Sequence, residues 1–377
     1  MAPAPVRLSL KGKESFSLCD IQIEEGVLGR IRTNLESLLE DIPSSIVIIT
    51  DSNLKKKYGE NLRRQLSKYT KTDLVSFNGG EKRKTFATVA ELLAKLASLK
   101  VDRKGVVVCL GGGVVGDLGG FVSSIYKRGI RYFQVPTTLL AQVDSSIGGK
   151  TGFDADWGKN QIGTFYQPRG VFIDPLSLDT LPKSEVINGL GEIIKYSVIA
   201  SRPMFEKLAK SNMDSVCELK QFVAECCRIK VRVVSKDERE DNLRSILNYG
   251  HTVGHALEAA SDYSLNHGKS VILGMLAEGW IAMGLGFFGA NDFERQEALL
   301  SSFKFADSSL RLEKRGLLVY ALADKKSSLG VMRMSLPEKI GKMHMTEGGS
   351  YLIPVSKKLF KGSINYLLEF CNLTRCC

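Results

Sequence analysis

Short apolar runs rich in β-branched residues alternate with longer segments of helical periodicity over the first half of the chain. Three of these runs are residues 45–50 (SIVIIT), 73–77 (DLVSF) and 105–110 (GVVVCL). Such alternation predicts buried, mainly parallel strands with helices on both faces of the sheet. Each run ends in turn-forming residues, namely Asp51-Ser52-Asn53, Asn78-Gly79-Gly80 and Gly111-Gly112-Gly113. Because ligands of open α/β sheets bind beyond the carboxyl ends of the strands, we expect these turns to line one crevice.

The pattern changes near residue 175, where long helical segments replace the strands. Few strand-like runs follow before residues 331–336. Pro175 and Pro182 bracket the change, since the residue before a proline is disfavoured in a helix. The sequence therefore predicts an α/β fold in two domains. Residues 1–176 form a Rossmann-like domain with a mainly parallel sheet, and residues 177–377 form a mostly helical domain.

Three of the four histidines, His251, His255 and His267, fall within 17 residues. The i, i+4 spacing of His251 and His255 places both imidazoles on one face of a helix, and Arg244 and Asn248 extend the same stripe. Satisfied polar residues are the alternative interpretation, but the crowding favours a functional site. The opposite stripe, expected to face the core, consists of Leu243, Ile246, Leu247, Val253 and Leu257.

A metal ion bound by these histidines would need a further protein ligand, because catalytic Zn²⁺ usually takes three side chains. The eight cysteines show no CxxC pairing, so a carboxylate is the better candidate. Glu192 stands out, because it lies three residues before Lys195 in an otherwise apolar helical segment. The pair predicts the wall of a site, with a surface ion pair as the alternative.

Two glycine-rich segments resemble phosphate-binding loops. Residues 111–116 match G-x-G-x-x-G after a strand, but without an acidic residue about twenty positions on, so pyrophosphate binding and a tight packing turn both stay open. Residues 148–151 (GGKT) resemble the end of a P-loop, but Asp144 stands where a glycine is required, which excludes that motif. Lys150 and Lys159 have no acidic partner in the sequence pattern, which favours an anionic ligand.

Composition changes this picture little. The net charge of +11 is compatible with an anionic small molecule, with nucleic acid or simply with solubility, and does not decide among them. The lysine-rich residues 55–71 lack the aromatic side chains of a nucleic-acid platform, so that stretch is expected to face solvent. No segment resembles a signal peptide or a membrane span, and the unevenly spaced cysteines are typical of reduced thiols. A cytoplasmic enzyme without nucleic-acid or membrane partners is expected.

Seven segments together resemble the 3-dehydroquinate synthase family of sugar phosphate cyclases. The resemblance spans residues 51 to 326 and implies a Rossmann-like nucleotide domain, a helical metal-binding domain and a homodimer. The segments are residues 111–121, 126–152, 158–168, 188–196, 237–240, 243–258 and 324–326.

The resemblance implies two cofactors. A divalent metal, Zn²⁺ or alternatively Co²⁺, would be held by Glu192, His251 and His267, which makes His255 a catalytic group rather than a ligand. NAD would be bound by Asp51, Ser52, Asn53, Glu81, Lys84, Gly112, Gly113, Val114, Asp117, Thr137, Thr138, Lys159, Thr180 and Asn188.

The implied substrate is a phosphorylated sugar acid, 3-deoxy-D-arabino-heptulosonate 7-phosphate. NAD-mediated transient oxidation, phosphate elimination, re-reduction and aldol closure convert it to 3-dehydroquinate and phosphate in the shikimate pathway. The implied catalytic residues are His255, Glu240, Lys195, Asp144 and Lys150. The implied substrate-binding residues are Arg128, Asn160, Lys230, Arg244, Asn248 and Lys325, with Arg128 reaching the neighbouring subunit.

Other functions compete with this one. A cyclase for a substrate without a carboxylate would lack the full cationic set of Lys230, Arg244 and residues 324–326, and a polyol or glycerol dehydrogenase would release NADH at each turnover. A non-catalytic NAD-binding descendant is a third alternative. One departure from the family pattern supports this alternative. The family usually has His-Gly-Glu at its last metal ligand, whereas this chain has His267-Gly268-Lys269, which puts a lysine in place of the glutamate.

Overall fold

The computed structural model of the 377-residue chain describes residues 4–11, 18–213, 215–262, 264–302, 317, 319–320 and 331–373. The chain divides into two compact units. Unit 1 comprises Met1–Pro182 and Val223–Glu238, and unit 2 comprises Lys183–Phe222 and Arg239–Cys377. Helix α8 (Val216–Lys236) runs from the second unit into the first. Each unit is described by itself below.

Unit 1 is built on a seven-stranded sheet with the order β1-β2-β9-β6-β5-β3-β4. The strands β1 and β2 pair antiparallel, and every other neighbouring pair is parallel. This confirms the predicted mainly parallel sheet. The strands are β1 (Val6–Lys11), β2 (Leu18–Ile23), β3 (Ile46–Asp51), β4 (Thr72–Phe77), β5 (Val106–Gly111), β6 (Arg131–Pro136) and β9 (Gly170–Ile173).

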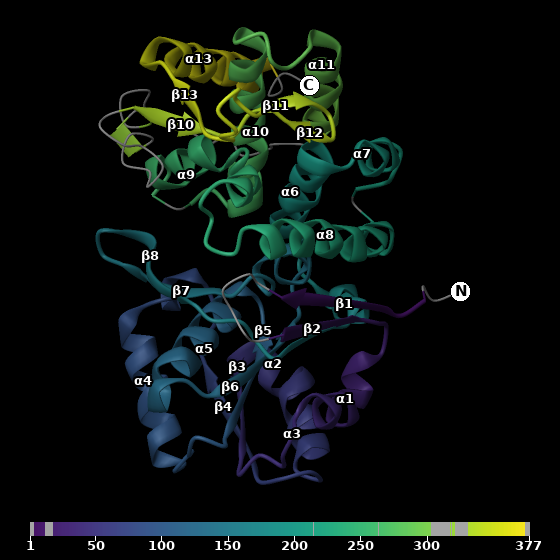
Figure 1. Ribbon diagram of the computed structural model, residues 1–377, viewed down its shortest axis with the longest axis vertical. Helices are drawn as coiled ribbons and strands as arrows, with labels where there is room; N and C mark the ends of the chain where they lie inside the picture. The colour runs from purple at the N-terminus through teal and green to yellow at the C-terminus, as the bar shows by residue number, and fades with distance from the viewer. Residues whose placement is uncertain are drawn as a thin grey trace. The chain divides into compact units, whose positions relative to one another are not determined.

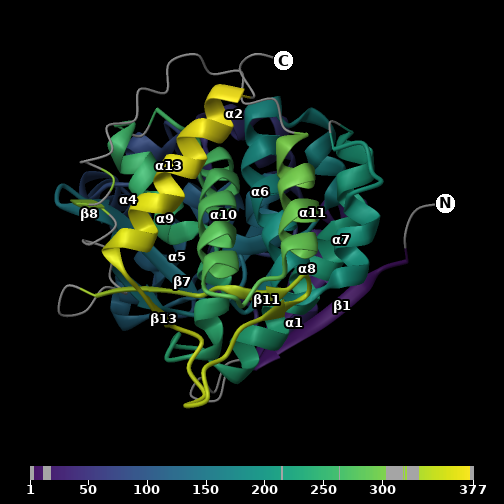
Figure 2. The same ribbon diagram turned by 90° about the horizontal axis from the view of Figure 1, so that it is seen from above.

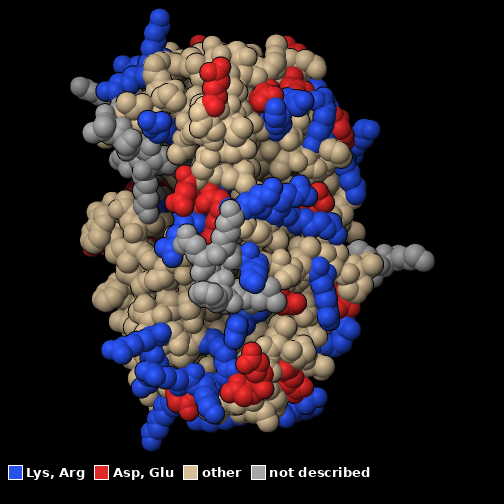
Figure 3. Space-filling model, in the orientation of Figure 1, with Lys and Arg blue, Asp and Glu red and all other residues tan. Residues whose placement is uncertain are grey.

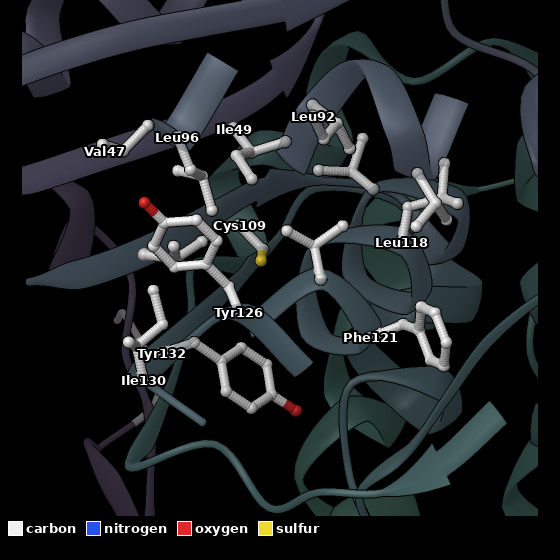
Figure 4. Packing of buried hydrophobic residues seen from close by; sticks show 14 of the residues in the cluster. Val47, Ile49, Leu92, Leu96, Cys109, Leu118, Phe121, Tyr126, Ile130 and Tyr132 are labelled. Atoms are coloured by element: carbon white, nitrogen blue, oxygen red, sulfur yellow. The ribbon is translucent and has the colours of Figure 1, made fainter. Parts of the chain in front are cut away.

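Alternating side chains of each central strand pack on opposite faces of this sheet. In β3, Ile46 and Ile48 face α1 (Ile31–Leu38) and α3 (Glu60–Leu66), whereas Val47 and Ile49 face α4 (Phe86–Ser98) and α5 (Gly113–Ile125). Figure 1 shows the two pairs of helices on either side of the sheet, and Figure 4 shows from close by the side chains packed between the sheet and helices α4 and α5. Strands buried on both faces explain the continuous apolar runs of the sequence.

The strand order reverses between β3 and β5. The chain passes from β3 to β4 on one side and then returns to β5 on the other side of β3. Asp51 and Gly111 therefore end neighbouring strands at a topological switch point, where α/β sheets bind ligands. The remaining elements of unit 1 are η1 (Val27–Arg30), α2 (Ser52–Leu54), η2 (Lys55–Gly59), η3 (Glu81–Arg83), η4 (Tyr126–Arg128), η5 (Ala141–Ser145), the hairpin β7 (Lys150–Ala155) and β8 (Gly158–Phe165), and η6 (Pro175–Thr180).

Unit 2 is mostly helical and centres on α10 (His267–Gly284), which is apolar and buried around most of its circumference. Figure 2 shows α10 between α13 (Lys357–Leu373) and α6 (Lys183–Ala200). The other elements are α7 (Arg202–Leu208), η7 (Leu243–Asn248), α9 (His251–Ala260), α11 (Ala290–Ser301), β10 (Met332–Met334), β11 (Pro337–Lys339), β12 (Lys342–Met343) and β13 (Ile353–Val355).

One predicted helix is interrupted. Arg244 and Asn248 were expected on the same helical stripe as His251, but they lie on the 3-10 helix η7, and α9 begins only at His251. Gly250 separates the two elements with a φ of 79°, a left-handed conformation that a continuing helix cannot contain. The single-helix prediction was therefore wrong.

The lysine-rich stretch faces solvent, as predicted from the sequence. Lysines 55, 56 and 57 are exposed, as are Arg63 and Arg64, and on the face drawn in Figure 3 basic side chains are interspersed with acidic ones. None of the six described cysteines forms a disulfide. Within the described ranges, no helix is both long enough and apolar enough to span a membrane.

Candidate functional site

Three side chains of unit 2 could hold a metal ion together. Glu192, His251 and His267 each offer one ligand atom, and these atoms lie within 4.8 Å of one another. The Oε1 atom of Glu192 is 3.3 Å from Nε2 of His251 and 3.5 Å from Nε2 of His267. The side chains come from α6, α9 and α10, so helix packing joins residues that are up to 75 positions apart.

These distances suit a tetrahedral cation. Ligand atoms about 2.0–2.1 Å from a Zn²⁺ ion lie about 3.3 Å from each other, close to both measured separations. Neither carboxylate oxygen of Glu192 has a described hydrogen-bond partner of ordinary geometry, although Lys195 forms an ion pair with one of them. A buried carboxylate facing two imidazoles is a donor set that a divalent cation would satisfy.

Glycines allow α6, α9 and α10 to approach closely enough to bring the three candidate ligands together. A Cβ atom on Gly191 would lie 2.8 Å from the carbonyl oxygen of Gly268, so α6 and α10 touch backbone to backbone beside Glu192 and His267. At the start of α9, a Cβ on Gly250 would lie 2.8 Å from the carbonyl oxygen of Val271 in α10. Small residues at both crossings therefore set the separation of the three candidate ligands.

Hydrogen bonds at Nδ1 orient both histidine rings. Nδ1 of His251 lies 3.2 Å from the carbonyl oxygen of Tyr249, and Nδ1 of His267 lies 2.7 Å from Oε1 of Glu258. Each bond leaves Nε2 facing Glu192. Sequence reasoning missed Glu258, although its position seven residues after His251 puts it on the same face of α9.

The predicted pair of Glu192 and Lys195 is buried, with relative exposures of 1% and 2%, so the surface ion-pair interpretation was wrong. Burial alone would raise the pKa of the Glu192 carboxyl, but the charge of the neighbouring Lys195 ammonium holds it well below its ordinary range. Burial lowers the pKa of His251, which favours the neutral, metal-binding imidazole.

The pKa of His267 is raised to about 10 in spite of burial, because the carboxylates of Glu192 and Glu258 face its two ring nitrogens. A cation that binds Nε2 of His267 must therefore displace a proton from the ring.

Of the other predicted residues of unit 2, His255 lies beside these candidate ligands. The ring centroid of the exposed His255 lies 5.3 Å from that of His251 and 6.3 Å from that of His267, so the predicted histidine cluster is confirmed. Arg244 is buried in η7, and the Asn248 amide donates to Glu240, which has a positive φ of 67°.

The turns after β3 and β5 form the predicted edge of unit 1. The Asp51 carboxylate caps α2 by accepting hydrogen bonds from the backbone of Asn53 at 2.8 Å and of Leu54 at 3.1 Å, and Ser52 donates to the carbonyl of Phe77. After β5, Gly112 precedes α5, whose first residues are Gly113 and Val114.

The turn at Gly112 also has a packing requirement. A Cβ on Gly112 would lie 2.9 Å from Cγ2 of Thr138, and one on Gly113 would lie 3.1 Å from Oγ of Ser145. The backbone of Thr137 donates to the carbonyl of Gly111. Tight packing is therefore confirmed at this turn, and pyrophosphate binding there stays a prediction.

Lys84 contacts two other predicted residues of unit 1. Its Nζ lies 2.7 Å from Oδ2 of Asp117 and 2.6 Å from Oδ1 of Asn160. Burial would lower the pKa of Lys84, but the carboxylates of Asp117 and Glu81 raise it. Lys159, expected to lack an acidic partner, lies 4.0 Å from Glu81 and is a correction to that expectation.

Lys230 of α8 also has an acidic partner, because its Nζ lies 2.9 Å from Oδ1 of Asp144 and 2.8 Å from the Asp144 carbonyl. Lys150 and Arg128 are exposed at the start of β7 and the end of η4. Thr180 lies 3.4 Å from the hydroxyl of Tyr58.

Two further predicted residues, Asn188 and Lys325, do not lie in the described part of unit 1. Asn188 belongs to unit 2, where its amide oxygen accepts a hydrogen bond from the backbone of Gly268, whereas the other predicted nucleotide ligands belong to unit 1. Lys325 and its neighbours lie outside the described residues.

Comparison with known proteins gives a family match in both halves of the chain. The family model described as 3-dehydroquinate synthase N-terminal matches residues 74–188, and the one described as 3-dehydroquinate synthase C-terminal matches residues 189–327. A 3-dehydroquinate synthase of Thermodesulfovibrio yellowstonii is 41% identical over 342 residues, which cover 88% of this chain and 93% of the relative.

Solved structures resemble the chain over nearly its whole length. A 2-deoxy-scyllo-inosose synthase complexed with carbaglucose-6-phosphate, NAD⁺ and Co²⁺ has a TM-score of 0.86 at 27% identity, covering 96% of this chain and all of that one. A 2-epi-5-epi-valiolone synthase of Streptomyces hygroscopicus, with NAD⁺ and Zn²⁺ bound, has a TM-score of 0.81 at 24% identity and covers 97% of this chain and 99% of its own. The predicted α/β fold with a helical second half is thereby confirmed.

Proposed function

Since the chain belongs to the 3-dehydroquinate synthase family, we propose that it converts 3-deoxy-D-arabino-heptulosonate 7-phosphate to 3-dehydroquinate and phosphate. The observation that carries this proposal is the match of both family models, which together span residues 74–327 without a gap. The clustering of Glu192, His251 and His267 adds support, because it supplies the metal ligands that the reaction requires.

The three clustered side chains would hold a divalent metal ion, and Zn²⁺ is the ion proposed. Two imidazole nitrogens and one carboxylate oxygen form a catalytic zinc set that leaves a fourth position open to substrate. A bound metal would supply Lewis-acid polarisation of a substrate alcohol. The ion pair of Lys195 with Glu192 keeps an ammonium group beside the cluster, where it can donate to a substrate hydroxyl.

NAD would bind at the edge of unit 1, where β3 and β5 end at the switch point. When bound, it would supply a reversible hydride acceptor. The amides that follow Gly112 open α5 and suit a pyrophosphate. Ser52, Asn53, Glu81, Lys84, Asp117, Thr137, Thr138, Lys159, Thr180 and Asn188 complete the proposed nucleotide set.

Cationic and amide side chains would recognise the sugar acid. Arg244 and Lys230 are proposed for the carboxylate, and Asn248 and Lys195 for hydroxyl groups. Both Lys230 and Arg244 are buried, so a carboxylate ligand would gain strong, charge-assisted hydrogen bonds from them. The proposed phosphate-binding residues are Lys150, Asn160, His255 and Lys325, with Arg128 contributed to a neighbouring subunit, and Asp144 and Glu240 are proposed to assist proton movement.

A second cyclase function has one observation in its favour, the TM-score of 0.86 with a 2-deoxy-scyllo-inosose synthase. The identity of 27% to that structure against 41% to the 3-dehydroquinate synthase favours the carboxylated substrate.

Purified protein should be incubated with the heptulosonate phosphate, Zn²⁺ and catalytic NAD⁺ while phosphate and dehydroquinate are followed. Turnover only of a sugar phosphate without a carboxylate, or stoichiometric NADH release, would contradict the proposal.

The homodimer and the cytoplasmic location belong to the same proposal. Four large apolar side chains on or near the hairpin of unit 1 are exposed, with Trp157 the most exposed at 72%, and they are proposed to be covered by the second chain. The other three are Phe86, Ile125 and Phe165. Light scattering of the purified protein should give twice the mass of one chain, and a monomer would refute the dimer.

A further inference from the structure

We propose that Glu258 is a positioning residue that fixes the ring of His267 for binding of the divalent metal ion. This role rests on the metal site of the proposed function and adds a carboxylate that does not touch the metal. Glu258 lies in α9, the helix that also carries His251, and it reaches across to the first residue of α10.

The geometry assigns one task to each nitrogen of the His267 ring. Nδ1 lies 2.7 Å from Oε1 of Glu258, a short distance that is typical of a hydrogen bond to a charged acceptor. Nε2, on the opposite edge of the ring, lies 3.5 Å from Oε1 of Glu192. Because Glu258 holds a proton on Nδ1, Nε2 is the nitrogen that would give up its proton to the metal ion and bind it.

Burial makes this hydrogen bond stronger than a surface contact. Glu258 has a relative exposure of 4%, and a carboxylate in such surroundings is costly unless it is paired or hydrogen-bonded. The imidazole N–H of His267 supplies such a donor, and the charge of the carboxylate makes Nε2 of the same ring a more basic ligand. Metal affinity should therefore depend on Glu258 although its oxygens face the far side of the ring.

The two histidine ligands differ in how they are held. His251 is oriented by a backbone carbonyl, that of Tyr249, at 3.2 Å, whereas His267 is oriented by a side chain. A substitution can remove the second anchor and leave the first intact. Glu258 thus offers a test of ring orientation that does not alter any proposed metal ligand.

The experiment measures metal affinity directly. Metal-free parent, Glu258→Gln and Glu258→Ala proteins are titrated with Zn²⁺ against a chromophoric chelator, and the Co²⁺ forms are compared by visible absorption. We expect Glu258→Ala to weaken Zn²⁺ binding about 10- to 100-fold, the usual effect of losing an outer carboxylate partner. Glu258→Gln should recover part of that loss, because its amide oxygen can still accept from Nδ1.

Glu297→Gln is the matched control. Glu297 lies in α11 of the same unit and accepts a hydrogen bond from the hydroxyl of Tyr366, so the variant also loses a carboxylate that is bonded to one ring side chain. Its Zn²⁺ affinity should stay within about twofold of the parent, and its Co²⁺ spectrum should be unchanged. A carboxylate that hydrogen-bonds a ring should affect metal affinity only where that ring belongs to a metal ligand.

Two results would overturn the role of Glu258. One is a Glu258→Ala protein that binds Zn²⁺ as tightly as the parent, and the other is an equal loss of affinity in Glu297→Gln, which would indicate general destabilisation. The proposed reaction fails separately: a parent that binds Zn²⁺ but leaves the heptulosonate phosphate unchanged would refute the reaction and leave the affinity comparison valid.

Discussion

Gly191→Ala tests whether backbone contact between α6 and α10 sets the metal centre. Gly191 precedes Glu192, and Gly268 follows His267, so the two glycines touch directly beside two candidate ligands. The added Cβ would lie 2.8 Å from the carbonyl oxygen and 3.0 Å from the Cα of Gly268. Both are backbone atoms that cannot rotate away, so the helices must separate.

The size of the effect follows from these distances. Non-bonded atoms prefer separations of about 3.5 Å, so relief of the clash requires a shift of about 0.5 Å or more. Overpacking of this kind costs about 1–3 kcal/mol, and the better helix propensity of alanine returns about 0.5–1 kcal/mol. The difference is a net loss of about 0–2.5 kcal/mol, and a value near its midpoint, about 1.2 kcal/mol, should lower the melting temperature by about 2–5 °C.

The same shift should weaken metal binding. Functional sites tolerate displacements of about 0.5 Å at most, and Glu192 now lies 3.3 Å and 3.5 Å from the two imidazole nitrogens. We expect the Zn²⁺ affinity of Gly191→Ala to fall about tenfold, equivalent to about 1.4 kcal/mol. Competition titration with a chelator measures the affinity, and circular dichroism on heating measures the melting temperature.

Gly284→Ala provides the control, because it makes the same substitution at the end of α10. Its Cβ would meet only Cδ1 of Leu359, at 3.3 Å, and that flexible side chain can move. This variant should melt within about 2 °C of the parent and bind Zn²⁺ equally well. If Gly191→Ala behaved like Gly284→Ala in both assays, the argument that close helix contact positions the ligands would be refuted.

Three other variants or treatments test the proposed site. Removal of metal with a chelator should abolish phosphate release, and added Zn²⁺ should restore it; full activity of demonstrably metal-free protein would exclude the Glu192, His251 and His267 site. Arg244→Ala should lower kcat/KM for the carboxylated substrate by about 10- to 100-fold, since a hydrogen bond to a charged group contributes about 1.5–3 kcal/mol; an unchanged value would favour a neutral substrate. Lys84→Met should weaken NAD⁺ binding by at least about tenfold, because Asp117 and Asn160 lose their shared cation, while Zn²⁺ affinity is retained; calorimetric titration with NAD⁺ that gave the parent affinity would count against the nucleotide edge.

The sequence by itself determined the strands and the local spacing of the histidines. Residues 45–50 and 105–110 carry a local signal, because buried parallel strands need continuous β-branched runs and end in turn residues, and they became β3 and β5. The i, i+4 spacing of His251 and His255 likewise fixed the side of α9 on which both rings lie.

The tertiary structure decided which distant residues meet. Whether Glu192 was a site residue or half of a surface ion pair depended on its burial against α10, and the partnership of Glu258 with His267 depended on the same packing. The break at Gly250, which ended the single predicted stripe, arises because that glycine adopts a left-handed φ where it packs against α10. Helical periodicity reports only neighbours within a few turns, whereas glycine contacts between helices set distances across tens of residues, and those distances bring the three candidate metal ligands together.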